Sequence, residues 1–492
     1  MTLSYLLILI ILIPFFSFLT SFRLKRYPNV REGVNIAFAF INFILSIVAY
    51  NKFSGGELAS FRFITLNQPI YLGFYAEKIS MIFALMVNFL WIISIFYSMG
   101  YMRGNKEKHQ SRFFAFFSLS ICFTLGIAFS SNLLTTFLFY EALTLATFPL
   151  VAHNINDENR SNVKVYLGVL IITSLILFLP AIIGTLVYLG SIDYTLGGLF
   201  IQQESTNIYV VLSLLLLFIF GIAKAGVMPV HKWLPAAMVA PTPVSALLHA
   251  VAVVKSGVFI LIKIVVYIFG IDYLNVILQK LFAINWILVI PCITIILASL
   301  IALSQDNLKK MLAYSTVSQL SYIVLGVLLL TNAGIISSIT NILAHAVAKI
   351  TLFFAAGAIY VIAHKTKISE LSGIGRKMPI TMTAFSIAAL SMIGFPLTGG
   401  FIAKWFLLKG IWESSQHWVL FVIIISTVLN ALYFLPIIFK AFFEKYHEDE
   451  DDNHEGDTTK KSLHMDIAMI ASATCVILLY IYSDSFIKIL IK

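Results

Sequence analysis

Apolar runs of about 20 residues recur along this chain, and they constrain its fold more than any other feature. We count about fourteen such runs between residues 3 and 490. Inside a bilayer every backbone N–H and C=O group needs a partner within the protein, so runs of this length are helices. Only 11% of the 492 residues are charged, against roughly 25% in soluble domains. The sequence therefore predicts an all-α polytopic membrane protein.

The basic residues cluster in alternate loops between these runs. The clusters are Arg23, Lys25, Arg26 and Arg31; Arg103, Lys106, Lys108 and Arg112; Lys309 and Lys310; and Lys365, Lys367, Arg376 and Lys377. The loop at 190–206 has no Lys or Arg. The net charge of +10 thus follows the positive-inside rule and does not indicate a nucleic-acid partner. We expect a multi-pass protein of a bacterial inner membrane, with the basic loops in the cytoplasm and both termini outside.

Ionisable side chains lie inside several of the predicted spans. They are Glu141, Lys224, His231, His249, Lys255, His345, Lys349 and Lys404. A charged group at the bilayer centre costs at least ~2.5–3.5 kcal/mol on insertion scales, so such groups mark an ion or substrate path. Any one histidine is as compatible with a satisfied core role as with proton transfer. As a set with the lysines, they predict a proton relay.

The eleventh span carries a polar stripe. Asn341, His345 and Lys349 recur at four-residue intervals and therefore share one helix face. Such a stripe cannot face lipid, so it must line the interior of the bundle.

The seventh and twelfth spans each combine a Pro or Gly interruption with a lysine. Pro229 removes a backbone donor between Lys224 and His231, where we expect an unwound turn. In the twelfth span the interruption precedes Lys404. The expected hinge residues are Pro229, Pro396, Gly399 and Gly400. Paired interrupted helices in corresponding positions indicate an inverted-repeat transporter and its site.

The chain divides into three parts on this interpretation. Residues 1–76 are scaffold helices, and residues 77–443 form the translocating domain, with halves at about 112–269 and 282–443. Residues 444–492 are an acidic cytoplasmic loop and the last span. Glu77 and Lys78, at the start of the third span, are interpreted as ordinary interfacial anchors. No catalytic residue, metal site or cofactor is predicted, because the chain lacks a phosphate-binding glycine motif and any cysteine ligand spacing.

Four segments resemble a known family. They read KAGVMPVHKWLPAAMVAPTPVSALLHAVAVVKSGV, LAYSTVSQLSYIVLG, HAVAKITLFFAAG and GFPLTGGFIAKWFLL. They are similar to the antiporter-like subunits of respiratory complex I, of Mrp cation/proton antiporters and of membrane-bound hydrogenases. The resemblance covers about residues 77–443. It implies a fourteen-helix subunit with two inverted five-helix halves, each holding a half-channel, and with helices 7 and 12 broken.

The resemblance also implies roles for individual residues. The proton-carrying positions of the family fall on Glu141, Lys224, His249, His345, Lys349 and Lys404, while Asn341 stands where many relatives have histidine. One complex I subunit type has glutamate in place of the last lysine, so Lys404 favours the other types. Because the chain ends after the fourteenth span, without a long lateral helix, we expect the greatest likeness to the D-type antiporter-like component of Mrp antiporters.

Three functions remain open at this point. The first is a proton-translocating subunit of a multisubunit Na+/H+ antiporter. The second is a proton-pumping subunit of an NADH-quinone oxidoreductase or a membrane-bound hydrogenase, which would make the chain part of an enzyme without catalytic residues of its own. The third, a scaffold, is disfavoured because helix–helix glue normally uses Ser, Thr, Asn or Gln. The first two predict other membrane subunits as partners, in contact with lipid, with protons and possibly Na+ as the ions carried.

Overall fold

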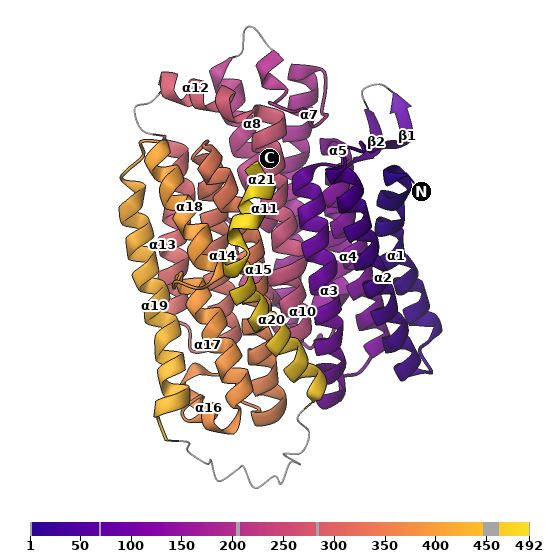
Figure 1. Ribbon diagram of the computed structural model, residues 1–492, viewed down its shortest axis with the longest axis vertical. Helices are drawn as coiled ribbons and strands as arrows, with labels where there is room; N and C mark the ends of the chain where they lie inside the picture. Colours follow the sequence, from indigo (N-terminus) through magenta and orange to yellow (C-terminus); the bar gives the residue numbers. More distant parts are fainter. Residues whose placement is uncertain (1, 68–69, 203–206, 282–284, 446–461, 492) are drawn as a thin grey trace.

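The computed structural model describes residues 2–67, 70–202, 207–281, 285–445 and 462–491. It is a bundle of helices that run side by side along the long axis (Figure 1). Within the described residues, twelve helical segments are long and apolar enough to cross a membrane. Two shorter apolar helices belong to the interrupted seventh and twelfth spans. Added to the twelve long segments, these two spans give the fourteen that were expected. The predicted all-α polytopic fold is confirmed.

The first part of the chain forms six spans and a hairpin. The elements are α1 (Leu3–Arg23), α2 (Pro28–Ser54), β1 (Ser60–Asn67), β2 (Ile70–Tyr75), α3 (Lys78–Gly104), α4 (Gln110–Phe129), α5 (Leu133–Val151), α6 (Arg160–Thr173), η1 (Ser174–Phe178), α7 (Leu179–Leu189) and η2 (Phe200–Gln202). Between α2 and α3, in the part predicted to be scaffold helices, the structure has an antiparallel hairpin in which Ser60 pairs with Tyr75.

The middle of the chain holds the first interrupted span and the span that follows it. The elements are α8 (Ile208–Gly221), η3 (Ala223–Ala225), α9 (Trp233–Ala236), η4 (Ala237–Val239), α10 (Thr242–Ala246), η5 (Leu247–Val251), α11 (Val253–Lys263), η6 (Ile264–Phe269) and α12 (Ile271–Leu281). Both η5 and η6 are π-helical turns, which widen this span without ending it.

The last part of the chain holds the second interrupted span. The elements are η7 (Trp286–Leu288), α13 (Val289–Leu303), α14 (Leu308–Leu328), α15 (Asn332–Ala363), η8 (Ile368–Glu370), α16 (Ile374–Lys377), α17 (Pro379–Ile393), α18 (Gly399–Glu413), α19 (Val419–Phe443), α20 (Leu463–Ile481) and α21 (Ser483–Ile491). The last span predicted within residues 444–492 is present as α20, and a further short helix, α21, follows it. The acidic loop predicted after residue 444 lies, from residue 446 to 461, outside the described residues.

The basic loops meet at one end of the bundle. Arg103 donates to Asn29 Oδ1 at 2.7 Å, and Asp306 accepts the backbone N–H of Ser369 at 2.9 Å. Both chain termini lie toward the opposite end (Figure 1). This arrangement has the sidedness that the positive-inside pattern predicts, while the identity of the two compartments stays a prediction.

The most deeply buried spans are α14 and the segment Thr242–Phe269. In both, 94% of the most apolar window is buried inside the molecule, against 28% for α2. With α15 beside them, they form the centre of the bundle, and this centre carries half of the ionisable residues predicted from the sequence, namely His249, Lys255, His345 and Lys349.

Candidate functional site

The first interruption begins before Lys224. Helix α8 ends at Gly221, and Lys224 lies in the single 3-10 turn η3. The unwound turn expected at Pro229, between Lys224 and His231, is present, and the interruption already begins at Ile222. The structure shows the reason, since the indole Nε1 of Trp233 donates to the Ala223 carbonyl at 2.8 Å. A carbonyl freed from helical bonding is thus satisfied from outside the helix.

Helix α11 passes directly against this turn. A Cβ atom on Gly257 would lie 2.3 Å from the carbonyl carbon of Lys224, so only glycine allows this approach. The seventh and eighth spans are therefore fixed to each other at the lysine.

The ammonium group of Lys224 is fully buried and faces helix α5. Its Nζ donates to the Tyr140 carbonyl and to Thr144 Oγ1 (2.7 Å), and it lies 3.3 Å from the centre of the Tyr140 ring. Glu141, which follows Tyr140 in the chain, interacts electrostatically with Lys224, but within the described chain the two form no ion pair. Glu141 Oε1 has no hydrogen-bond partner there either. The acid acts on this lysine from a distance.

The centre of the molecule brings two predicted residues into contact. Lys255 Nζ on α11 meets His345 Nδ1 on α15, and both side chains are buried. The other ring nitrogen of His345 has no partner among the described residues. His345 also lines a cavity of about 10 Å³ together with Asn341 and Lys404. A cavity of this size has room for about one water molecule.

The second interruption lies between α17 and α18. Lys404 reaches back across it, and its Nζ donates to the Ile393 carbonyl at 2.7 Å and to Thr427 Oγ1 at 2.9 Å. Ile393 is the last residue of α17, so the ammonium sits at the negative end of that helix dipole. Within the described residues, no carboxylate forms an ion pair with Lys404.

The predicted hinge residues of this span have separate places. Pro396 lies in the non-helical link, whereas Gly399 and Gly400 are the first two residues of α18. A Cβ atom on Gly400 would lie 1.9 Å from the Ser391 carbonyl oxygen, so this glycine allows the close approach of the two half-helices.

Helix α14 connects other members of the set. Ser315 accepts a hydrogen bond from Lys349, whose Nζ also donates to the Leu312 carbonyl at 2.9 Å. The next residue, Thr316, is hydrogen bonded to His249 Nδ1 at 3.1 Å. No residue of α14 was among the predicted site residues. Its run of Ser315, Thr316, Ser318, Gln319 and Ser321 inside an apolar span was the available signal.

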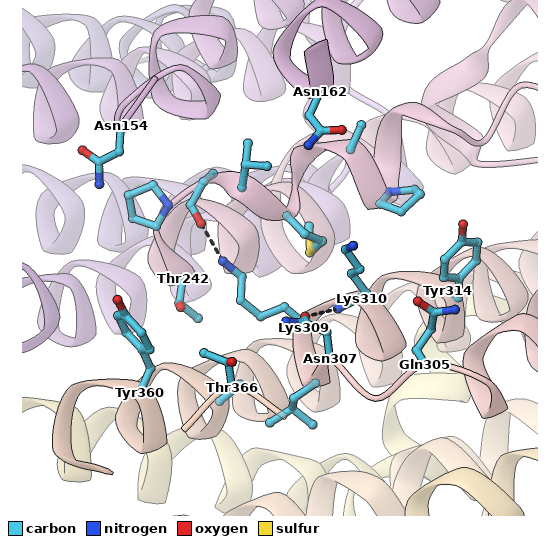
Figure 2. Close-up of a pocket in the computed structure, with 18 of the residues that line it drawn as sticks. Asn154, Asn162, Thr242, Gln305, Asn307, Lys309, Lys310, Tyr314, Tyr360 and Thr366 are labelled. Atoms are coloured by element: carbon cyan, nitrogen blue, oxygen red, sulfur yellow. Dashed lines mark hydrogen bonds between the residues drawn. The ribbon is translucent and has the colours of Figure 1, made fainter. Parts of the chain in front are cut away.

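His231 lies apart from this central group. It lines a pocket of about 830 Å³ at the end of the basic loops, together with Lys232, Lys309 and Lys310. Figure 2 shows this pocket, with Lys309 Nζ donating to the Ala240 carbonyl at 2.6 Å. The described structure thus puts His231 at this pocket and not beside Lys255.

Comparison with known proteins identifies the family of this chain. The family described as "NADH:quinone oxidoreductase/Mrp antiporter, TM" matches residues 130–430, which is more than half of the chain. A second description, "NADH-Ubiquinone oxidoreductase (complex I), chain 5 N-terminus", matches residues 63–114. The chain belongs to the NADH:quinone oxidoreductase/Mrp antiporter family. The family predicted from the sequence is confirmed.

Curated relatives in this family are subunits of quinone oxidoreductases. The NADH-quinone oxidoreductase subunit N of Desulforudis audaxviator is 30% identical over 361 residues, covering 73% of this chain and 70% of that protein. Subunit L of Rickettsia felis is 31% identical over 394 residues, covering 78% of this chain but only 58% of that protein. This chain therefore spans less than two thirds of the length of the subunit L relative.

Two solved structures share the fold. One is the membrane-bound sulfane sulfur reductase, an archaeal respiratory membrane complex, with a TM-score of 0.83, 22% identity and coverage of 98% of this chain and 96% of that one. The other is the Mrp complex from Dietzia, also at 0.83, with 19% identity and coverage of 98% and 95%. At these identities the likeness concerns the fold alone.

One buried pair in this antiporter-like subunit was missed from the sequence. Glu77, interpreted as an interfacial anchor, is only 6% exposed, and its Oε1 lies 3.3 Å from Nζ of the fully buried Lys263. The anchor interpretation is wrong for Glu77. Lys263 stands in the apolar run of the same span as Lys255, and the criterion that found Lys255 could have found it too.

Proposed function

We propose that this chain is the proton-translocating subunit of a multisubunit monovalent cation/proton antiporter that exchanges Na+ for H+. The observation that carries the proposal is the buried connection between Lys255, His345 and Lys404, through a side-chain contact and a shared cavity. An imidazole can accept a proton at one nitrogen and release it from the other. His345 is therefore suited to pass protons between the two lysines.

The lysines supply the driving interaction. Each can hold a proton as an ammonium or release it as an amine, and a positive charge arriving nearby disfavours the charged form. A proton on Lys255 thus promotes release from its neighbours. Lys349 and His249, held by adjacent hydroxyls of α14, extend the same buried group. Lys224, with Glu141 as a distant counter-charge, is proposed as the member near the first interruption.

A second candidate function is supported by the relatives. Those at 30% and 31% identity are subunits N and L of NADH-quinone oxidoreductases. In a complex of that kind, the same relay would be driven by quinone chemistry in other subunits. Either function requires membrane partners. The face of α5 that carries Glu141 also exposes Leu138 (45%) and Leu145 (61%), which fits a neighbouring subunit there.

The arrangement in the membrane belongs to the same proposal. We assign the end with the basic loops to the cytoplasm of a bacterial cell, and residues 77–443 to the translocating domain. A cysteine in place of Leu196, in the loop without basic residues, should react with an impermeant thiol reagent in intact cells. A cysteine in place of Lys367 should react only after the cells are opened. The reverse labelling pattern would contradict this orientation.

Purification of the native complex tests which function applies. We expect mass spectrometry to identify antiporter subunits as partners. In vesicles that hold an imposed pH gradient, added Na+ should then collapse the gradient, and a complex with Lys404→Ala should not respond. Acidification that depends on NADH and quinone, with no response to Na+, would favour the second function.

A further inference from the structure

A second pocket opens at the end of the molecule opposite the basic loops. Its volume is about 490 Å³, and it lies beside the hairpin β1–β2 seen at the upper right of Figure 1. Its lining residues come from the hairpin, from the residue before α3, from the link between α4 and α5, from the loop after α7 and from η6. Those with polar groups are Ser60, Arg62, Tyr71, Tyr75, Glu77, Ser131, Asp193, Tyr194, Thr195 and Tyr267. None of these residues belongs to the relay described above.

Glu77 connects this pocket to the interior. Oε1 of Glu77 faces Lys263 Nζ at 3.3 Å, whereas Oε2 has no hydrogen bond of ordinary geometry within the described chain. The Tyr267 hydroxyl also faces the carboxylate. Leaving a buried carboxylate oxygen without a hydrogen bond is destabilising. Glu77 itself lines the pocket, so its carboxylate contacts both the pocket and Lys263.

Lys263 lies behind Glu77 as seen from the pocket. It is fully buried, donates to the Ser130 carbonyl at 2.7 Å, and lies 4.2 Å from the centre of the Tyr194 ring. Lys263 and Lys255 are both on α11, eight residues apart, which corresponds to about 12 Å along a helix. The pair therefore stands between the central relay and the second pocket.

The remaining charges around the pocket balance each other. Arg62 on β1 and Asp193 in the loop after α7 add one charge of each sign to the pair Glu77–Lys263. Burial raises the pKa of Asp193, while the Tyr71 hydroxyl and Arg62 oppose that shift. Tyr75 on β2 and Tyr194 complete the titratable groups on this side. With no excess of negative charge and an ammonium beside the carboxylate, the pocket is better suited to a proton than to a metal cation.

We propose that Glu77 and Lys263 form an outward-facing proton-exchange site, by which the relay also reaches the solution on the side of the hairpin. The ammonium of Lys263 passes a proton to the Glu77 carboxylate, which leaves an amine and a carboxylic acid. The acid releases this proton to water in the pocket, and the amine takes the next proton from the side of Lys255. The inference rests on the proposed proton translocation.

Transport by isosteric variants separates this role from a structural one. In reconstituted complexes, Glu77→Gln should reduce proton transport roughly a hundredfold, which is typical for loss of a positioned proton-transfer group. The double variant Glu77→Gln/Lys263→Gln should be equally inactive, although it removes both charges together. Glu57→Gln, which removes a half-buried ion pair with Lys52 at the same end, is the matched control and should transport normally. Normal transport by the double variant would overturn the site.

A measurement on the unmodified complex avoids the risk that the variants fail to assemble. A water-soluble carbodiimide added to the hairpin side should modify Glu77, faster as the pH of that side falls, because the reagent reacts with protonated carboxyl groups. Absence of modification at every pH would overturn the proposal. Lys404→Ala reports on the relay separately. If that variant is inactive while Glu77→Gln transports normally, only the outward site is wrong, whereas normal transport by Lys404→Ala removes the proposed function itself.

Discussion

The two interrupted spans hold their lysines by different means. Lys224 lies within the break, donates to an internal carbonyl of α5 and packs on the Tyr140 ring, with Glu141 next to its partner. Lys404 lies in the half-helix after the break and donates to the carbonyl at the end of the half-helix before it. The charge of Lys224 is balanced by the distant acid Glu141, and the charge of Lys404 is balanced by the C-terminal end of α17. One sequence pattern, a lysine beside a Pro or Gly interruption, thus produces two electrostatic environments.

The backbone of the two breaks is built more alike than the lysine sites. In each, a glycine permits contact at a distance that a side chain would forbid, namely Gly257 against Lys224 and Gly400 against Ser391. The breaks are therefore fixed by packing, while the charge environments differ. Variants can test these two properties independently.

The largest effect is expected at Lys404. Lys404→Ala removes the ammonium, and Lys404→Arg keeps a positive charge that does not release its proton. Both should lower proton transport roughly a hundredfold or more, with normal amounts of assembled complex. Vesicles that report pH by fluorescence measure this. Lys409→Arg is the matched control, because Lys409 is exposed on the same helix and should tolerate the change. Full transport by Lys404→Arg would show that only an anchoring charge is needed.

The next largest effect is expected for the packing glycines. Gly257→Ala and Gly400→Ala place a Cβ atom 2.3 Å and 1.9 Å from backbone atoms, which cannot move aside as a side-chain end can. Overpacking of this kind costs typically about 1–3 kcal/mol. Both variants should lower the thermal unfolding temperature in detergent and reduce transport. Gly168→Ala is the control, since a Cβ there has no neighbour within 4 Å. Unchanged stability of Gly400→Ala would show that the second break adapts where the first does not.

A smaller effect is expected for Glu141. Glu141→Gln removes a charge that acts on Lys224 without touching it, so transport should fall about tenfold, a coupling of ~1.4 kcal/mol. The complex should still assemble. Because Lys404 has no ion-paired acid among the described residues, no single neutralised carboxylate near the second break should have the same effect. Normal transport by Glu141→Gln would remove the acid from the mechanism and make the two lysine sites equivalent.

The sequence predicted the features that depend on the length of an apolar run and on the free-energy cost of placing a charge inside it. The fourteen spans follow from apolar runs, and Lys224, Lys255 and Lys404 are visible because a charge inside such a run is expensive. The start of the first break at Ile222 was not predictable, because it depends on a partner, Trp233, that folding brings back to the Ala223 carbonyl. The local rule for proline did place an unwound turn at Pro229, but it could not say how far back the interruption extends.

The sequence also could not predict which side chains of distant helices contact each other. Glu77 stands where an anchor would, and nothing near it predicts that Lys263 lies 3.3 Å away. Helix α14 was unassigned for a related reason. Its hydroxyl side chains are of the type that commonly satisfies itself on the preceding turn, as Thr316 does with the Leu312 carbonyl at 2.8 Å. Only the neighbouring helices reveal that Ser315 and Thr316 also hold Lys349 and His249.

The smallest effect is expected at Asp306, which ties the second half together at its basic end. Its two carboxylate oxygens accept the backbone N–H and the hydroxyl of Ser369, each at 2.9 Å. The backbone N–H bond is the main cause that lowers the pKa of Asp306 below its ordinary value near 3.8. A lowered pKa means that the carboxylate stabilises the folded protein above the ordinary value, and that this contribution is lost as the pH falls through the lowered one.

Asp306→Asn should therefore unfold at a slightly lower temperature than the unmodified protein at neutral pH, and the difference should vanish in strong acid. Thermal unfolding of the purified complex across this pH range measures the effect. The group is mostly exposed, so the shift should be small. The contact between Asp306 and Ser369 joins the loop before α14 to the loop after α15. Proton transport, which depends on Lys404, should therefore change little in this variant, and the surroundings of Lys224 should not change. A difference between the two proteins that persists at the lowest pH would show that it does not come from the charge of the Asp306 carboxylate.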